Sequence, residues 1–222
     1  MLRVPSYLLR VTLADRPGHL GSLAVALGSV GADILSLDVV ERTPGLAIDD
    51  LVVDLPPGAM PDLLITAAEA LNGVRVDSIR PHTGLLDAHR ELELIDHIAA
   101  GRDRLGKLRV LADEAPRVLR VGWCTVVCLQ NHGFERIVGS PSAPETVPES
   151  APWLPLEHAA ALDGAADWVP QIWHSMDTTL AAAPLGSPQC AVVLGRSGGP
   201  QFRPSEVARL GYLAGIVATI LG

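Results

Sequence analysis

The sequence has little positive charge, and this shortage limits the partners that the protein can have. Its 222 residues include 17 lysines and arginines against 25 aspartates and glutamates, for a formal net charge of -8. A nucleic-acid-binding surface needs an excess of cations to neutralise phosphates, so we expect no nucleic-acid partner. Lysine is rarer still, because Lys107 is the only one and lies in a charged helical stretch. Schiff-base chemistry is therefore not expected.

Cysteine is also scarce, and long apolar runs are missing. Three cysteines are an odd number, which argues against a secreted disulfide framework and favours a reducing compartment. The longest apolar stretch, residues 210–221, is too short to span a bilayer. The first 18 residues are interrupted by arginines and lack a small-residue cleavage site, so they do not resemble a signal peptide. These features predict a cytoplasmic protein that does not bind membranes.

The first 80 residues predict six elements in the order strand, helix, strand, strand, helix, strand. Alternating apolar residues predict strands over 7–13, 35–40, 50–55 and 74–79, and apolar residues three and four apart predict helices over 18–30 and 61–71. This order in so short a segment is that of the split βαβ, ferredoxin-like arrangement, with four antiparallel strands and two helices on one face. The sequence therefore predicts an α+β domain here.

The turn between the first strand and the first helix, "DRPGHL" at 15–20, is a candidate binding site. Gly18 lets the backbone approach a ligand closely, and Pro17 fixes the direction of entry. The N–H groups at the start of the helix suit a carboxylate, and Asp15 and Asp33 would accept an ammonium group. A zwitterion fits better than a phosphate, which two carboxylates would repel. The alternative is a tight turn that only begins a helix, whereas the spacing of the glycines excludes a dinucleotide-binding fingerprint.

A ferredoxin-like unit whose first strand runs into "DRPGHLGSLAVALGSVGADILSL" resembles an ACT domain, a regulatory module that binds amino acids and similar metabolites. The positions that match the family motif are Asp15, Pro17, Gly18, Leu20, Gly31 and Ile34, while Asp33 stands where many members have asparagine. The resemblance covers about residues 5–80 and implies an amino-acid ligand. It implies that the ligand is bound by Leu13, Asp15, Arg16, Pro17, Gly18, His19, Leu20, Asp33 and Ile34. For His19, a solvent-facing turn residue is the alternative.

Residues 84–118 predict an amphipathic helix, or two helices broken near Gly101. Its apolar stripe consists of Leu85, Leu92, Ile95, Ala99, Leu105, Leu108 and Leu111. The stripe needs a partner, which is either one of the flanking domains or a second copy of the helix in a dimer. We therefore divide the chain into a ligand-binding domain at 1–83, a helical connector at 84–104 and a second domain at 105–222.

The second domain combines strands, a long loop and a terminal helix. Strands are expected over 120–130, 135–139, 177–183 and 189–195, and a helix is expected from Pro204 onward. The proline-rich segment 140–157 reads as a loop over a pocket or on the surface. Pro184-Leu185-Gly186, the strand at 190–194, Phe202-Arg203-Pro204 and the terminal helix together resemble a GAF domain over about residues 105–222. This resemblance implies an α/β/α domain with an antiparallel sheet that senses a second ligand or dimerises.

Two patterns that could carry chemistry are set aside. Gly195 to Gly199 match G-x-S-x-G, but no helix begins at Ser197 and no histidine follows it, as a hydrolase of that order requires. Cys124, Cys128 and His132 are four residues apart, and buried apolar cysteines fit that spacing better than a metal site does.

The sequence as a whole predicts a non-enzymatic regulatory protein that binds an amino acid in its first domain. The edge strands of the ferredoxin-like sheet and the apolar stripe of the connector predict a homodimer. No cofactor and no metal are expected. Two alternatives stay open: an enzyme whose pocket lies under the loop at 140–157, and a purely structural dimerisation module.

Overall fold

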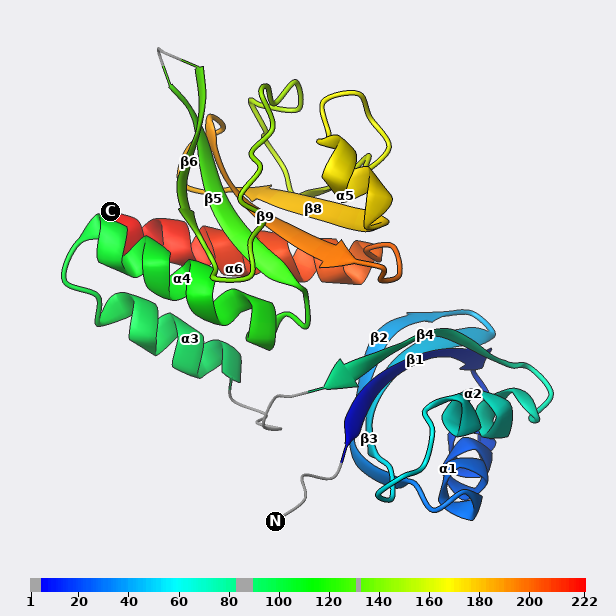
Figure 1. The fold of residues 1–222 in the computed structure, drawn as a ribbon. Coiled ribbons are helices and arrows are strands. Elements are labelled where there is room, and N and C mark those ends of the chain that lie inside the picture. Colours follow the sequence, from blue (N-terminus) through cyan, green and yellow to red (C-terminus); the bar gives the residue numbers. More distant parts are fainter. Residues whose placement is uncertain (1–4, 83–89, 131–132) are drawn as a thin grey trace. The chain divides into compact units, whose positions relative to one another are not determined.

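The computed structural model describes residues 5–82, 90–130 and 133–222. The chain divides into two compact units, Met1–Leu86 and Asp87–Gly222, each of which contains one antiparallel sheet covered by helices (Figure 1). The predicted α+β fold class is confirmed. Within the described residues, no helix combines the length and the apolar character needed to cross a membrane.

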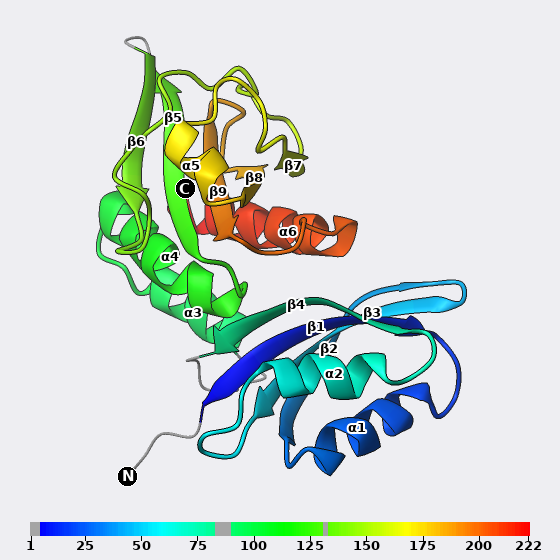
Figure 2. The ribbon, with the colours of Figure 1, turned by 45° about the vertical axis from the view of Figure 1, so that its right-hand side comes forward.

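The first unit has the predicted ferredoxin-like topology. Its elements are β1 (Ser6–Ala14), α1 (His19–Ser29), β2 (Asp33–Thr43), β3 (Leu46–Asp54), α2 (Asp62–Glu69) and β4 (Val74–His82). The strands lie in the order β2-β3-β1-β4 and every neighbouring pair is antiparallel. Both helices cover the same face of this sheet (Figure 2). The β2 strand is therefore an edge strand, with one side that no strand of the described chain pairs.

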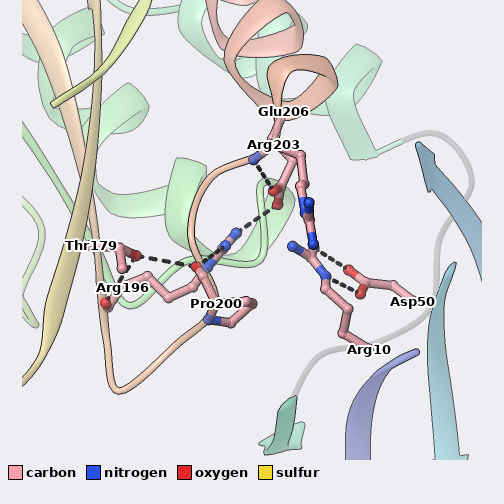
Figure 3. A network of polar contacts seen from close by, with 7 residues as sticks. All are labelled: Arg10, Asp50, Thr179, Arg196, Pro200, Arg203 and Glu206. Carbon is pink, nitrogen blue, oxygen red and sulfur yellow. Dashed lines mark hydrogen bonds and ion pairs between the residues drawn. The ribbon is translucent and has the colours of Figure 1, made fainter. Parts of the chain in front are cut away.

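Alternation along β1 separates an apolar face from a polar one. Leu9 and Val11 point into the core beneath the helices, where they pack with Leu23 of α1. Arg10 points to the opposite face and forms two hydrogen bonds, of 2.7 and 2.9 Å, to the carboxylate of Asp50 (Figure 3). These two residues are direct cross-strand neighbours, so the pair stabilises the β1–β3 register.

The second unit is a sheet between helices on one face and loops on the other. Its elements are α3 (Arg90–Ala99), α4 (Arg104–Val118), β5 (Trp123–Gln130), β6 (Gly133–Gly139), β7 (Ala160–Leu162), α5 (Gln171–Ser175), β8 (Thr178–Pro184), β9 (Cys190–Ser197) and α6 (Pro204–Leu221). The strand order is β6-β5-β9-β8-β7, all antiparallel. Helices α4 and α6 cover one face, with α3 packed on them, while α5 and the loop after β6 cover the other (Figure 1). The short elements β7 and α5 were not predicted.

The segment expected to be a connector is part of the second unit. It forms the two helices α3 and α4, which are separated after Ala99 as the break near Gly101 predicted. Leu94 and Ile98 of α3 are fully buried in a core that includes Leu108 and the terminal helix. The apolar face of α3 therefore packs within the chain, although Leu94 and Ile98 are not residues of the predicted stripe. The predicted stripe was partly wrong, because Leu92 is 66% exposed, and Leu85 lies outside the described residues.

Two of the three cysteines form a disulfide, contrary to the expectation from the sequence. Cys128 of β5 and Cys190 of β9 face each other across the sheet with their Cα atoms 4.1 Å apart, and they form a disulfide. Cys124 is free and fully buried, and burial raises the pKa of its thiol. The odd number of cysteines was a poor guide, because two can pair and leave one over. Because disulfides persist mainly in oxidising environments, this argument for a reducing compartment fails.

A polar network joins the end of β9 to the start of α6 (Figure 3). The buried guanidinium of Arg196 donates to the carbonyl of Pro200 at 3.0 Å and to the Glu206 carboxylate at 2.7 Å. Glu206 also accepts the backbone N–H of Arg203 at 2.9 Å, and the Arg196 guanidinium lies 4.4 Å from the centre of the Phe202 ring. These contacts fix the loop that leads into the terminal helix.

Candidate functional site

The turn between β1 and α1 is a candidate site in the first unit. Gly18 has φ of +85°, a conformation that favours glycine, and its carbonyl accepts the backbone N–H of Ser22 at 2.9 Å. Apart from the adjoining residues of the chain, no described atom lies within 4 Å of the position where a Gly18 side chain would begin. Arg16 and Pro17 beside it are exposed. The turn therefore presents open backbone at the surface, and this geometry agrees both with a ligand-binding turn and with an ordinary turn.

Asp15, which was predicted to accept the ammonium group of a ligand, already has a cationic partner. Arg42 of β2 donates to both of its carboxylate oxygens, at 2.6 and 2.9 Å. The hydrogen bonds from Arg42 lower the pKa of Asp15. A ligand's ammonium group would have to compete with this guanidinium.

His19 has a structural role that the sequence did not predict. Its side chain is buried, with Nδ1 3.1 Å from the carbonyl of Ala14 and Nε2 3.1 Å from the carbonyl of Asn72. The ring therefore joins the end of β1 to the segment after α2. Neither expectation for this residue, ligand contact or a solvent-facing position, describes it.

The other predicted ligand residues do not come together in one chain. The backbone N–H of Asp15 donates to Gly45, in the turn that joins β2 to β3. Asp33 instead lies opposite Asp54 in the β2–β3 register, at the other end of the same two strands. The ten-residue step from Asp33 to Thr43 corresponds to about 33 Å of strand. Ile34 lies at the far end with Asp33, Leu13 is buried in the core, and Leu20 is partly exposed on α1. A site that includes both aspartates needs a second copy of the chain.

A buried carboxylate near the turn was missed by the sequence analysis. Asp49 of β3 is 3% exposed, and its Oδ1 has no hydrogen-bond partner among the described residues. Burial raises the pKa of Asp49, and the neighbouring Asp50 and Asp15 raise it further. The alternation of β3 did not reveal this residue, because Asp49 occupies a position of the same parity as the core residues Ala47 and Leu51.

The second unit contains a pocket on the face of the sheet that the helices leave free. It holds about 360 Å³ of space not filled by atoms, part of it open to solvent. Trp123, Val127 and Val193 form its floor, because odd-numbered residues of β5 and β9 face away from the helices. The segment 143–148 of the proline-rich loop forms part of its wall. The structure thus fits the predicted loop over a pocket.

All four tryptophans of the chain line this pocket. Trp123 and Trp173 form a tilted pair with ring centres 5.0 Å apart, and Trp153 and Trp168 form another at 5.9 Å. The indole N–H groups of Trp123, Trp153 and Trp173 are buried and have no acceptor among the described residues. Buried donors without partners are rare in folded proteins, so these three are a feature to be explained.

Arg136 of β6 is the charged residue of the pocket lining. Its guanidinium donates one hydrogen bond, of 2.5 Å, to the carbonyl of Pro144 in the covering loop. A guanidinium has five N–H donors, and the bond to Pro144 uses one of them. No aspartate, glutamate, histidine or cysteine belongs to the lining in the described part of the chain.

Sequence reasoning missed the tryptophans because they are spread over residues 123–173 and come from different elements. A usable signal did exist: the chain has only eight phenylalanine, tyrosine and tryptophan residues, and of the four tryptophans Trp153 lies in the proline-rich loop while the other three lie before or after it. Elsewhere, the described residues contain no cluster of histidine, cysteine or acidic side chains that could hold a metal. His132 lies outside the described residues.

The G-x-S-x-G segment has a packing explanation. Ser197 ends β9, and its hydroxyl lies 3.5 Å from that of Thr178, with α6 beginning only at Pro204. A side chain at Gly195 would begin 1.9 Å from the Trp123 ring, and one at Gly199 would begin 2.2 Å from Arg196. Both glycines therefore make room for larger neighbours.

Comparison with known proteins finds no matching protein-family model and no matching curated protein. Among solved structures, the GAF domain of an Acinetobacter phosphoenolpyruvate-protein phosphotransferase is 10% identical with a TM-score of 0.44, covering 62% of this chain and 96% of that one. A formyltetrahydrofolate deformylase from Pseudomonas putida KT2440 is 11% identical with a TM-score of 0.29, covering 98% and 94%.

A third structure, an unknown protein from Galdieria sulphuraria, is 20% identical with a TM-score of 0.33. The alignment covers 44% of this chain and 64% of that one, which is less than two thirds of its length. All three similarities are weak, and the function has to be argued from the geometry of the sites.

Proposed function

We propose that the protein is a non-enzymatic regulator that binds a small molecule in the tryptophan pocket, defined as the cavity lined by Trp123, Trp153, Trp168, Trp173 and Arg136. The observation that carries this proposal is the convergence of every tryptophan of the chain on one cavity, with three buried indole N–H groups that have no acceptor among the described residues. A concave, mostly apolar site with a few polar groups is typical of small-molecule binding.

The composition of the lining favours binding over catalysis. General acid–base catalysis needs a group that exchanges protons near neutral pH, and covalent catalysis needs an activated nucleophile. Among the described lining residues, only the hydroxyls of Thr125 and Thr146 resemble a nucleophile or a proton-exchanging group. The hydroxyl of Thr125 already donates a hydrogen bond to the carbonyl of Val138 at 3.0 Å. A bound molecule would therefore stay unchanged and act by stabilising one state of the protein.

A second candidate site is the turn at Gly18, where an amino acid would bind between two copies of the chain. The open space at Gly18 and its left-handed backbone support this proposal. The edge strand β2 supports it too, because pairing of two copies along an edge would bring Asp33 of one copy toward another molecule. The ammonium group would then replace Arg42 as the partner of Asp15.

A thermal-shift screen tests both candidates. The twenty amino acids, nucleotides, cyclic nucleotides and a set of aromatic and aliphatic metabolites are added to the full chain, and a ligand of the folded state raises the melting temperature. A pocket ligand changes tryptophan fluorescence and loses affinity in Trp153→Phe but not in Gly18→Ala. An amino acid at the turn gives the reverse pattern. If no compound raises the melting temperature, the regulatory proposal fails.

A further inference from the structure

The walls of the tryptophan pocket are aromatic on more than one side. The pair Trp123–Trp173 and the pair Trp153–Trp168 both contribute to it, and Phe134 of β6 adds a further ring. Indole faces attract two kinds of ligand: a flat aromatic ring, by stacking or edge contact, and a cation, through the electron-rich faces of the rings. The aromatic walls alone do not distinguish these classes.

Charge decides between the two classes. Arg136 lines the pocket, and the described lining contains no carboxylate to balance it. A cationic ligand would meet a like charge there, at a partly buried position where such repulsion is stronger than in water. An anionic ligand would instead gain charge-assisted hydrogen bonds from the guanidinium, which matches a carboxylate in shape.

The indole nitrogens point to the same conclusion by a different route. An indole N–H is a donor only, so it can be satisfied by an acceptor but never by another N–H or by a cation. Trp123 and Trp173 are 3% and 5% exposed, and both indole nitrogens lack an acceptor within the described chain. A ligand with several oxygen acceptors would satisfy donors that the protein leaves unmatched.

We infer that the tryptophan pocket selects a planar aromatic carboxylate. The ring lies among the indoles, and the carboxylate faces Arg136 and the unmatched N–H donors. This inference rests on the proposed function, because it names the chemical class of the ligand for the same pocket. It excludes aliphatic acids, which lack the flat ring, and aromatic cations, which lack the acceptors.

Calorimetric titration of the full chain with four matched compounds tests the assignment. Benzoate carries both features, cyclohexanecarboxylate lacks the flat ring, benzyl alcohol lacks the charge, and benzyltrimethylammonium reverses it. We expect benzoate to bind at least tenfold more tightly than each of the others. Tryptophan fluorescence excited at 295 nm follows the same titrations, and every tryptophan of the chain reports on the pocket.

Two variants identify the groups responsible. Arg136→Met keeps an unbranched apolar stem and removes the charged guanidinium, so the affinity for benzoate should fall at least tenfold while that for benzyl alcohol stays within about twofold. Arg109→Met is the matched control, because Arg109 is exposed on α4, on the other side of the sheet. It should change neither affinity. Trp153→Phe keeps an aromatic wall but removes one donor, and it should weaken benzoate binding.

The results separate this inference from the function on which it rests. Tighter binding of benzyltrimethylammonium than of benzoate would overturn the inference and make the pocket a cation cage, while the pocket would still be a binding site. Equal binding of benzoate by Arg136→Met and the wild type would also overturn it. If none of the four compounds binds but another metabolite from the screen changes tryptophan fluorescence, only the ligand class is wrong. If nothing binds in either experiment, the proposed function fails as well.

Discussion

Gly195 and Trp123 face each other across β5 and β9, and this pair couples the sheet to the pocket. The indole of Trp123 lies over the glycine so closely that the first carbon of any side chain would overlap it. Trp123 can therefore form part of the pocket floor only because Gly195, on the neighbouring strand β9, has no side chain. A glycine that matched a catalytic motif in the sequence instead has a role in packing.

Gly195→Ala tests this coupling. The added methyl group would lie 1.9 Å from the Trp123 ring, so the ring has to move, and we expect a loss of about 1–3 kcal/mol in the free energy of unfolding. Urea denaturation followed by tryptophan fluorescence measures it. Gly215→Ala is the control, because a side chain at this exposed position of α6 would meet no described atom within 4 Å beyond its own helix, and alanine should stabilise the helix by about 0.5–1 kcal/mol. Equal effects of the two substitutions would contradict the packing role.

For Asp49, we expect a substitution to stabilise the folded protein rather than destabilise it. Burial raises the pKa of this carboxyl above its ordinary value of 3.8, so the folded state disfavours the ionised form. The protein is therefore less stable at neutral pH than an uncharged side chain would make it, and this deficit disappears as the pH falls from the raised folded pKa to below 3.8. Asp49→Asn should raise the urea midpoint at pH 7, with a gain that shrinks toward pH 4.

Asp15→Asn is the matched comparison for Asp49→Asn. The hydrogen bonds from Arg42 lower the pKa of Asp15, so its ionised form stabilises the folded state above the ordinary pKa, and this contribution is lost as the pH falls through the lowered one. Its replacement should lower the urea midpoint at pH 7 or leave it unchanged. A lower midpoint for Asp49→Asn at pH 7 would show that its carboxylate is satisfied in the folded protein.

At the scale of elements, sequence periodicity predicted what depends on local packing. The strands and helices of the first unit have one apolar face each, so their order and type followed from spacing alone. Segments too short to show a period were missed, namely the three residues of β7 and the five of α5. The face of α3 was misjudged for a related reason: Leu92 and Leu94 differ by two positions, and only the tertiary contacts decide which one is buried.

Ile98→Ala tests whether α3 is a structural part of the second unit. Ile98 is fully buried in the helical core, so truncation should leave a cavity and cost about 2–5 kcal/mol. Leu92→Ala, on the exposed side of the same helix, should change the free energy of unfolding by no more than about 0.5 kcal/mol. Tryptophan fluorescence follows the second unit selectively, because all four tryptophans lie in it. If Ile98→Ala leaves the free energy of unfolding unchanged, α3 is a connector and not a structural part of the second unit.

Functional residues were harder to predict than elements, because sites depend on which strand ends meet. The turn at Gly18 was recognised from its own sequence, since a left-handed glycine at the start of a helix is a local feature. The distance between Asp15 and Asp33 depends on strand direction, because Asp15 follows β1 and Asp33 begins β2, and both strands run antiparallel to β3. The disulfide likewise depends on the β5–β9 register, and the tryptophan pocket depends on a loop that returns over the sheet. These non-local relations appear only in the folded chain.

At the scale of the whole molecule, the outstanding question is how many copies the protein contains. The β2 strand ends the sheet of the first unit, and it carries three exposed apolar residues: Leu35, Leu37 and Val39, which are 41%, 36% and 59% exposed. The strand has register irregularities between Ile34 and Ser36 and between Val39 and Glu41, which weaken an edge for pairing, but its unpaired backbone groups beside exposed apolar side chains still invite pairing with another chain. The edge is therefore the surface on which we expect a second copy.

Light scattering at micromolar concentration should give a mass of about twice the 23.4 kDa of one chain. Val39→Lys places a charge on this edge and should shift the protein to the monomer. Val25→Lys is the control, because Val25 is 74% exposed on α1 and the same substitution there should leave the mass unchanged. A monomeric wild type, or equal dissociation by both lysine substitutions, would rule out the β2 edge. Since one chain holds Asp15 and Asp33 at opposite ends of its sheet, the same result would also remove the amino-acid site between copies and leave the tryptophan pocket as the binding site.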